Sequence, residues 1–133
     1  VYANYATQVT NNTATYADTG LTASITPKYS SSKILVLACV NGLEKSNSAT
    51  ANGVGLKLLR DASVISNYIR YASWTNATTS MITPSGFFSY LDSPATTSSI
   101  TYKVQFANEN NVAAVFVQST SNASSMTIME IAG

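Results

Sequence analysis

The sequence of 133 residues contains no histidine and only one cysteine. Without histidine the chain cannot perform Ser-His-Asp hydrolysis, use a histidine general base or build a histidine-containing zinc site. The single cysteine, Cys39, excludes an intrachain disulfide and a cysteine-rich metal knuckle, and we interpret it as a small buried apolar side chain. We therefore expect no cofactor and no metal centre of these kinds. A calcium site built from loop Asp and Asn side chains stays open, although no spaced ligand loop is present.

Charged residues make up only 10% of the chain, and the net charge is +1, whereas about 25% of residues are charged in ordinary soluble proteins. Such a chain offers no basic face to nucleic acid and no polybasic anchor to a membrane. The longest apolar run, Ile34–Val40, has seven residues, far fewer than the roughly 20 of a membrane-spanning helix. We expect neither nucleic-acid binding nor membrane insertion.

The first residues have no basic or apolar segment of the kind that marks a signal peptide. The chain also does not begin with Met, so we expect that it was processed or cut from a longer protein. Its length predicts a single domain spanning residues 1–133, with 1–12 as a candidate attachment or linker segment.

Serine, threonine and asparagine together supply more than a third of the residues, and apolar residues supply 45%. Runs of strand length rich in Thr, Val, Ile and Tyr alternate with Asn/Gly/Ser/Pro clusters, and long stripes of helical period are absent. This pattern predicts an all-β sandwich or barrel of about ten antiparallel strands. The expected strands are 2–9, 13–17, 21–26, 33–41, 54–60, 63–72, 81–91, 99–107, 112–118 and 125–131.

The segments between these strands are interpreted as turns and loops. Asp18–Gly20 is expected to be a turn, and 44–53, 73–80 and 93–97 are expected to be surface loops. Pro84 and Gly86 lie inside an expected strand, which indicates an edge, a bulge or a break at that point.

Two expected strands, 34–40 and 112–117, are apolar on both faces, whereas 99–107 alternates cleanly between apolar and polar residues. A two-layer sandwich covers only one face of each sheet. The doubly apolar strands therefore predict a second cover, which we expect to be another subunit. The alternative is that these strands lie centrally, with small side chains such as Ala38 and Ala114 facing loops.

Four segments carry a resemblance to a known family: Asp18–Pro27 (DTGLTASITP), Ser31–Val36 (SSKILV), Gly55–Asp61 (GLKLLRD) and Met126–Gly133 (MTIMEIAG). Together they resemble a β-module of tail-fibre and related virion proteins of bacteriophages, over nearly the whole chain. Such modules resemble the jelly roll of the tumour necrosis factor and complement globular-head superfamily. The resemblance implies a homotrimer in which strands of one sheet pack around the threefold axis, and it carries no catalytic motif. The candidate subunit-interface residues are Tyr5, Tyr102, Phe106, Met126, Ile128 and Glu130.

Glu130 lies in an apolar strand, where an unpaired carboxylate would be costly. We predict that it pairs with Arg60, Lys57 or Lys103, within the chain or across a subunit boundary. The other acids are scattered, mostly in turn-like contexts, and no pair stands out for the two-carboxylate chemistry of a glycosidase.

A cluster of aromatic and polar residues near the end of one expected hairpin is the candidate ligand- or receptor-binding site. Aromatic faces stack on the C–H surfaces of sugars, Asn and Arg bond hydroxyl groups, and aromatic residues and Arg dominate protein interfaces. The alternative is that Tyr68 and Tyr71 pack in the sandwich and that Trp74 covers the base of a loop. For the polar loops 44–52 and 108–111, simple solvation is favoured over binding. The candidate site residues are Tyr68, Arg70, Tyr71, Trp74 and Asn76.

These observations favour a non-enzymatic, homotrimeric jelly-roll module on the surface of a phage virion. The first expectation is a C-terminal domain of a tail fibre or tail spike that binds a glycan or protein of the host surface. The alternative is a capsid decoration protein that binds capsid protein, with a broad attachment base that includes Val1–Thr10. A secreted jelly-roll lectin or signalling ligand is a remote alternative, and a polysaccharide depolymerase is disfavoured.

Overall fold

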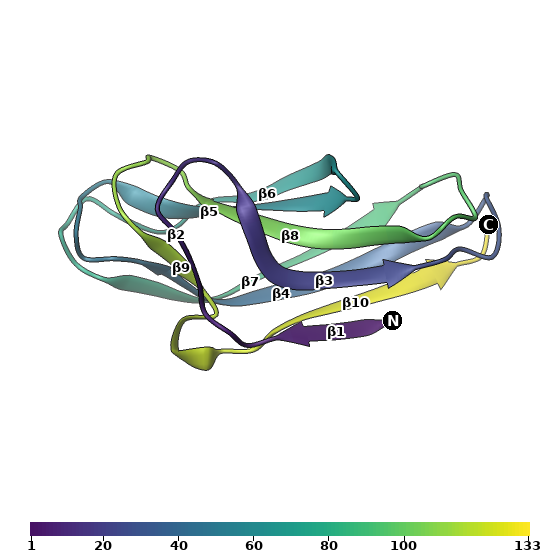
Figure 1. The fold of residues 1–133 in the computed structure, drawn as a ribbon, viewed down its shortest axis with the longest axis horizontal. Helices are drawn as coiled ribbons and strands as arrows, with labels where there is room; N and C mark the ends of the chain where they lie inside the picture. Colours follow the sequence, from purple (N-terminus) through teal and green to yellow (C-terminus); the bar gives the residue numbers. More distant parts are fainter.

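Ten β-strands and one short 3₁₀ helix make up the computed structural model, which describes all residues 1–133 (Figure 1). The all-β prediction is therefore confirmed. The elements are β1 (Tyr2–Tyr5), β2 (Val9–Asn11), β3 (Ala17–Ile25), β4 (Lys33–Lys45), β5 (Asn52–Arg60), β6 (Ser63–Thr75), β7 (Met81–Asp92), β8 (Ile100–Asn108), β9 (Val115–Val117), η1 (Ser119–Ser121) and β10 (Ser124–Ile131).

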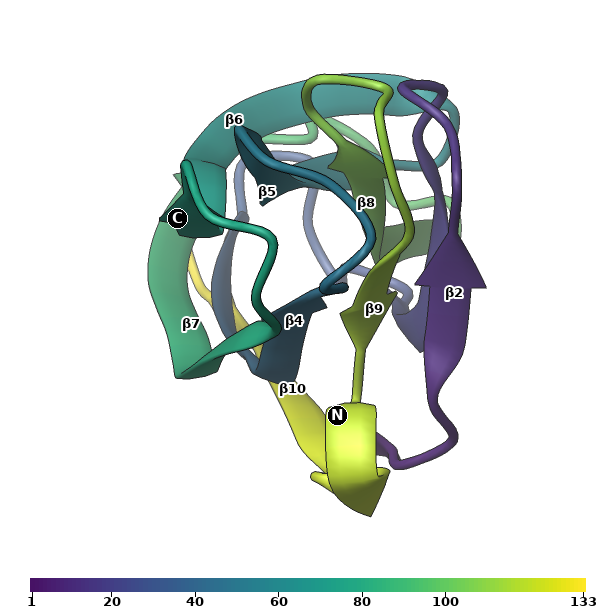
Figure 2. The ribbon, with the colours of Figure 1, turned by 90° about the vertical axis from the view of Figure 1, so that its left-hand side faces the viewer.

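The strands form two antiparallel sheets, as expected for a sandwich. The larger sheet has the order β1-β10-β4-β9-β2, with β7 on the opposite edge of β4, and the smaller sheet has the order β3-β8-β5-β6. Strand β4 organises the larger sheet, because β10 pairs with its first half, β9 pairs with its last two residues and β7 follows it along its length. Figure 2 shows β6 curving over toward β7, so that the two sheets approach each other along one side.

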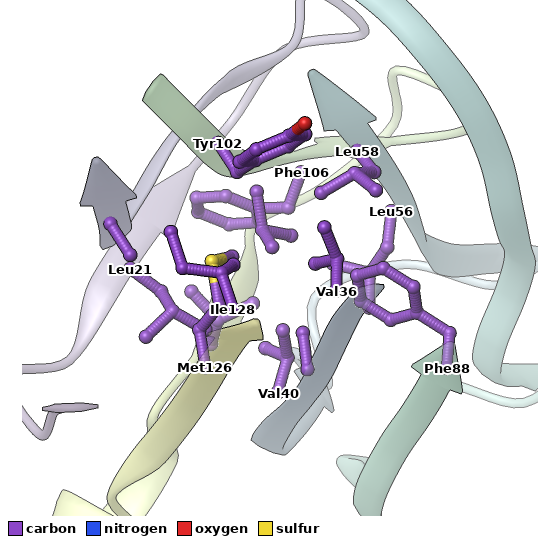
Figure 3. Packing of buried hydrophobic residues seen from close by; sticks show 14 of the residues in the cluster. Leu21, Val36, Val40, Leu56, Leu58, Phe88, Tyr102, Phe106, Met126 and Ile128 are labelled. Carbon is purple, nitrogen blue, oxygen red and sulfur yellow. The ribbon is translucent and has the colours of Figure 1, made fainter. Parts of the chain in front are cut away.

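The core lies between the sheets and follows the two-residue period of the strands. In β4, alternate residues from Ile34 to Val40 point inward and are essentially inaccessible to solvent. They meet the inward residues of β8 across the sandwich, among them Tyr102 and Phe106 (Figure 3). Each fully buried side chain of this size contributes roughly 1.5–3 kcal/mol through removal of apolar surface from water.

Several expected element boundaries are wrong. Asp18–Gly20 is not a turn between two strands but the bulged part of one strand, β3, and 13–17 is not a strand. The bulge is stable because buried Thr19 replaces a lost ladder contact: its Oγ1 donates to Val104 O at 2.9 Å and accepts from Leu21 N–H. Gly20 adopts a φ of 86°, which residues with a side chain rarely adopt.

Other strands differ from expectation in length. The expected strand 2–9 is divided into β1 and β2, and both belong to the larger sheet. Strands β4 and β6 extend to Lys45 and Thr75, so the intervening loops shrink to 46–51 and 76–80. Strand β7 contains Pro84 and Gly86 and lies at the edge of the larger sheet, which is one of the three arrangements that these residues indicate.

The outward faces of the two sheets differ in chemistry. The outward face of the smaller sheet is polar and charged, with Asp18, Lys57, Lys103 and Gln105 on it. The outward face of the larger sheet is rich in apolar side chains, interrupted by Ser89, Ser125 and Thr127, and its central β4 side chains are only half-buried. This second surface, the outer apolar face, comprises Tyr2, Leu35, Leu37, Cys39, Phe87, Leu91, Met129 and Ile131.

Alternate side chains of 34–40 thus point into the core, and the others lie on the outer apolar face, which no other segment of the chain covers. The segment 112–117 is different, because only Val115–Val117 forms a strand and Val112 lies exposed in the preceding loop. The structure contains no helix of the length and apolar character needed to span a bilayer.

The two ends of the sandwich are also distinct. The loops that follow β4, β6 and β8 lie together at one end, whereas the C-terminus lies at the other and the N-terminus is on the same side as the C-terminus (Figure 1). Residues of the loop end are therefore brought together from four parts of the chain: 12–16, 46–51, 76–80 and 109–114.

Candidate functional site

An open hollow of about 390 Å³ lies at the loop end of the sandwich and is lined by Tyr71, Trp74 and Asn110. We call it the aromatic hollow. Both rings are exposed, at 42% for Tyr71 and 45% for Trp74. Two exposed aromatic rings next to an amide form a surface that can stack on an apolar ring face and bond polar groups at its rim.

The irregular backbone of β6 directs these aromatic side chains. The pairing of β5 with β6 shifts register four times, and Tyr71 and Ser73 both adopt the left-handed conformation, with φ of 60° and 57°. Ser73 stabilises this irregular conformation. Its hydroxyl group donates to Leu43 O at 2.7 Å and accepts from Thr83 N–H. Strand β6 is thereby tied to the larger sheet beneath the hollow.

Lys45 anchors the loop that follows β6 through hydrogen bonds to its backbone. This lysine is fully buried, and its ammonium group donates to the carbonyl oxygens of Ala77 and Thr79. A buried ammonium group without such acceptors would be unfavourable, so Lys45 fixes the path of the loop 76–80.

Asn110 comes from the loop between β8 and β9. Asn108 shapes this loop, because its Oδ1 accepts from the backbone N–H groups of Asn110 and Asn111 at 3.1 and 2.9 Å. The Asn110 amide donates to Ala51 O on the neighbouring loop. Its amide oxygen accepts no hydrogen bond from the chain.

A second hollow, of about 340 Å³, adjoins the first on the outward face of the smaller sheet, and we call it the polar hollow. Glu109 is at its base, with a side chain only 7% exposed. One carboxylate oxygen accepts from Tyr16 OH at 2.6 Å, and the other accepts from Arg70 Nη2 at 2.8 Å. The residues that line it are Tyr16, Lys57, Asn67, Arg70 and Glu109.

The electrostatics of the polar hollow follow from these contacts. Burial, and then the hydrogen bond to Glu109, raise the pKa of Tyr16. The same carboxylate raises the pKa of Arg70. Lys57 places its ammonium group 3.6 Å from the centre of the Tyr16 ring and forms no ion pair. The hollow therefore has one cation whose charge no carboxylate offsets.

Gly55 makes this arrangement sterically feasible. A Cβ at this position of β5 would overlap the Glu109 carboxylate and lie 2.5 Å from Tyr16 OH. The absence of a side chain thus leaves the space that the Tyr16–Glu109 hydrogen bond occupies.

The two hollows share a wall. Arg70 and Tyr71 are consecutive, the guanidinium carbon lies 5.1 Å from the Tyr71 ring centre, and Arg70 Nη2 donates to Tyr71 OH at 3.4 Å. Glu109 and Asn110 are likewise consecutive on the other side. A single extended ligand can therefore contact both hollows.

Of the residues predicted for this site, the structure brings Arg70, Tyr71 and Trp74 together. Tyr68 points into the core instead, where its ring stacks on Phe88 with centroids 3.5 Å apart. Its hydroxyl group is buried without a hydrogen-bond partner. Asn76 lies in the exposed loop outside both hollows.

The sequence interpretation missed five residues that line the two hollows. One of them, Asn67, lies on β6 itself, and the others come from the loop before β3, from β5 and from the loop after β8, which only the sheet topology brings to β6. The local signal for two of them is the polar loop 108–111, for which the sequence alone favours simple solvation. The missed residues are Tyr16, Lys57, Asn67, Glu109 and Asn110.

The residues predicted for a subunit interface lie elsewhere than expected. Four of them are fully buried between the sheets of one chain and are inaccessible to a partner; these are Tyr102, Phe106, Met126 and Ile128. Tyr5 is half-buried, with its ring packed against Gly20. Strand period explains the difference, because the inward and outward residues of one strand alternate. In β10 the outward residues, such as Met129, belong to the outer apolar face, whereas the outward residues of β8, such as Lys103, belong to the polar face of the smaller sheet.

The predicted partners of Glu130 are also wrong. Its carboxylate accepts from the backbone N–H of Lys28 at 2.7 Å, and the polar groups of this turn, first the nearby Ser32 hydroxyl and then backbone N–H groups, lower its pKa. Arg60 pairs instead with Asp92, and Lys103 pairs with Asp18.

No group of three or more acidic or cysteine side chains gathers in a way that would hold a metal ion. Comparison with known proteins adds no assignment: no protein-family model matches the chain, and no curated protein matches it.

Proposed function

We propose that this chain is a non-enzymatic surface module of a bacteriophage virion, a homotrimeric receptor-binding domain of a tail fibre or spike. The observation that carries the proposal is the aromatic hollow, which lies at the end of the sandwich remote from both termini. A chain attached to a particle through either terminus would present this hollow outward to a host glycan or protein.

The strand pairing supports a jelly roll. The strand pairs nest inside one another along the sequence: β1 with β10, β3 with β8, β4 with β7 and β5 with β6. A long hairpin rolled into two sheets gives this nesting, and it is the connectivity of a jelly roll. The resemblance of the sequence to phage jelly-roll modules is consistent with it.

The outer apolar face supports a trimer. Phe87 is 65% exposed and Leu91 is 49% exposed on an edge strand of this face. Exposed apolar side chains gathered on one sheet face are typical of subunit interfaces, and the outward face of the other sheet is polar. A second and a third copy of the chain are the occupants that we propose for this face.

Trimerisation would repeat the aromatic hollow three times on one particle. A single shallow site binds a sugar weakly, but linked sites raise the overall affinity by orders of magnitude when they engage together. The proposed function thus depends on both surfaces: the larger sheet assembles the module and the loop end binds.

The first experiment measures the mass of the protein in solution and its binding to a panel of bacterial strains and their purified surface polysaccharides. Light scattering should give three times 14.1 kDa. Trp74→Ala should abolish binding without changing this mass. Tyr29→Ala is the matched control, because Tyr29 is an exposed aromatic residue, more exposed than Trp74, in the loop between β3 and β4.

Two outcomes would contradict the proposal. A monomer would remove the assembly argument. A trimer that binds no bacterial surface, or that binds equally well with Trp74→Ala, would favour the capsid decoration alternative, in which the trimer binds capsid protein.

A further inference from the structure

We propose that the two adjoining hollows bind one acidic saccharide, with a neutral sugar ring in the aromatic hollow and a singly charged anionic substituent of the neighbouring sugar in the polar hollow. The substituent would be a carboxylate or a sulfate ester. This inference rests on the proposed function and specifies its ligand.

The charge of the polar hollow selects an anion. The charge of Glu109 is offset by Arg70, which donates to the same carboxylate oxygen from Nε at 3.2 Å and from Nη2 at 2.8 Å. The other oxygen of Glu109 is occupied by Tyr16 OH. Lys57 remains as the one cation without a carboxylate partner, so the hollow carries a net charge of one positive unit.

One uncompensated cation matches one negative charge. A carboxylate or a sulfate ester carries a single charge, whereas a phosphate monoester carries about −1.5 to −2 at pH 7. Asn67, next to Lys57 across the β5–β6 pair, adds an amide donor at the same rim. The ammonium and the amide together can bond the two oxygens of a carboxylate or two oxygens of a sulfate ester.

The aromatic hollow requires a different group. It has apolar walls, from Tyr71 and Trp74, and one amide, from Asn110. An anion would lose its hydration there without a compensating charge, whereas the C–H face of a neutral sugar would stack on the rings. Because Arg70 and Tyr71 form the shared wall, the two kinds of sugar must be adjacent in the ligand.

The test uses matched pairs of oligosaccharides on an array. A hyaluronan hexasaccharide, in which neutral and carboxylate-bearing sugars alternate, is compared with its carboxyl-reduced form. A keratan sulfate oligosaccharide, which has sulfate but no carboxylate, is compared with its desulfated form. We expect at least one acidic member to bind about three- to tenfold more tightly than its neutral counterpart, as one partly exposed charge-assisted contact allows. The difference should shrink as salt rises.

Two variants locate the charge effect. Lys57→Met removes the ammonium group but keeps an apolar stem against Tyr16, and it should reduce binding of the acidic members to that of their neutral counterparts. Lys103→Met makes the same change in net charge outside the hollow, where Lys103 pairs with Asp18, and it should have no effect.

The outcomes separate this inference from the proposed function. If acidic and neutral members bind equally, or if Lys57→Met weakens both, the acidic-saccharide inference is overturned while a Trp74-dependent glycan site stands. If no saccharide on the array binds, the inference is overturned, and the bacterial-surface binding of Trp74→Ala still decides the proposed function independently.

Discussion

Arg70 and Glu109 are joined by two hydrogen bonds to a single carboxylate oxygen, from Nε and from Nη2 of the guanidinium group. The pair joins β6 to the loop after β8, two segments that are 39 residues apart in the sequence. The guanidinium group is largely exposed, whereas the carboxylate is nearly buried. The two residues therefore respond differently to loss of the partner. Without Glu109 the exposed guanidinium group stays hydrated, whereas without Arg70 the buried carboxylate is left poorly hydrated.

This asymmetry predicts strong coupling between the two residues. Arg70→Met should lower the free energy of unfolding more than expected for an exposed ion pair, because Glu109 is left as a buried charge with one neutral donor, Tyr16. The double variant Arg70→Met/Glu109→Met should be less destabilised than the sum of the two single variants. Urea denaturation of the four proteins measures the coupling, and additive effects would show that the pair is merely a surface contact.

Gly55 predicts a second dependence. Gly55→Ala should destabilise the protein by about 1–3 kcal/mol, the usual cost of inserting a methyl group into a filled space. It should also displace Glu109 and weaken ligand binding. In a Glu109→Ala background the same substitution should cost less, because the carboxylate that it would overlap is gone. An equal loss of stability in both backgrounds would show that the added methyl group does not clash with the Glu109 carboxylate.

The strands and their antiparallel arrangement could be predicted from the sequence because alternation and turn residues are local signals. Strand β8 is the clearest example, since its polar and apolar residues alternate from Ile100 to Phe106. The turn expected at Asp18–Gly20 failed for a physical reason: Thr19 supplies the missing hydrogen bonds from its side chain, so the strand continues through a sequence typical of turns.

The candidate site could be predicted only in part. Arg70, Tyr71 and Trp74 are close in sequence, so the sequence alone can group them. Tyr68 was included with them because periodicity cannot be followed through β6, whose register shifts and left-handed residues change which side chains face outward. Lys57 and Glu109 could not be predicted, because no pattern in the local sequence connects a lysine in the middle of a strand with an acid in a distant loop. The pairing of β5 with β8 brings them together.

A buried polar network at the other end of the core predicts a clear order of stability effects. Asp92, which is 6% exposed, accepts from Tyr102 OH at 2.7 Å and from Arg60 Nη1 through both carboxylate oxygens. Tyr102→Phe should cost about 1.5 kcal/mol, because Asp92 keeps Arg60. Asp92→Ala should cost about 3 kcal/mol, because it removes the hydrogen bonds from both Tyr102 and Arg60 and opens a cavity. The reverse order in thermal or urea unfolding would contradict this assignment.

The tyrosine environments predict loss of stability in alkali. Burial raises the pKa of Tyr68, and burial together with hydrogen bonds to Asp92 and Glu109 raises the pKa values of Tyr102 and Tyr16. In the unfolded chain these phenols ionise near pH 10. Above that pH the unfolded state binds fewer protons than the folded state, so stability is retained below about pH 10 and falls as pH rises beyond it.

Tyr68→Phe isolates one contribution to this alkaline loss. Its buried hydroxyl has no partner, so the substitution should be neutral or stabilising by about 1 kcal/mol at pH 7. It should also make the fall in stability above pH 10 less steep. Urea midpoints between pH 7 and 11, followed together with absorbance at 295 nm, measure both effects. A destabilised variant at pH 7 would indicate a hydrogen bond that the hydroxyl makes in solution.

The outer apolar face predicts the response of the oligomer to a single charge. Phe87→Glu places a carboxylate at an exposed position on this face, beside Cys39 of β4. A charge buried without a partner between subunits is strongly unfavourable, so the mass should fall from three times 14.1 kDa to 14.1 kDa while the circular dichroism of the chain is preserved. Ser24→Glu adds the same charge to the polar outward face of the smaller sheet and should leave the trimer intact.

If Ser24→Glu dissociates the protein and Phe87→Glu does not, the chains assemble through the smaller sheet. The polar hollow would then lie near the subunit boundary, since Lys57 is on that same face.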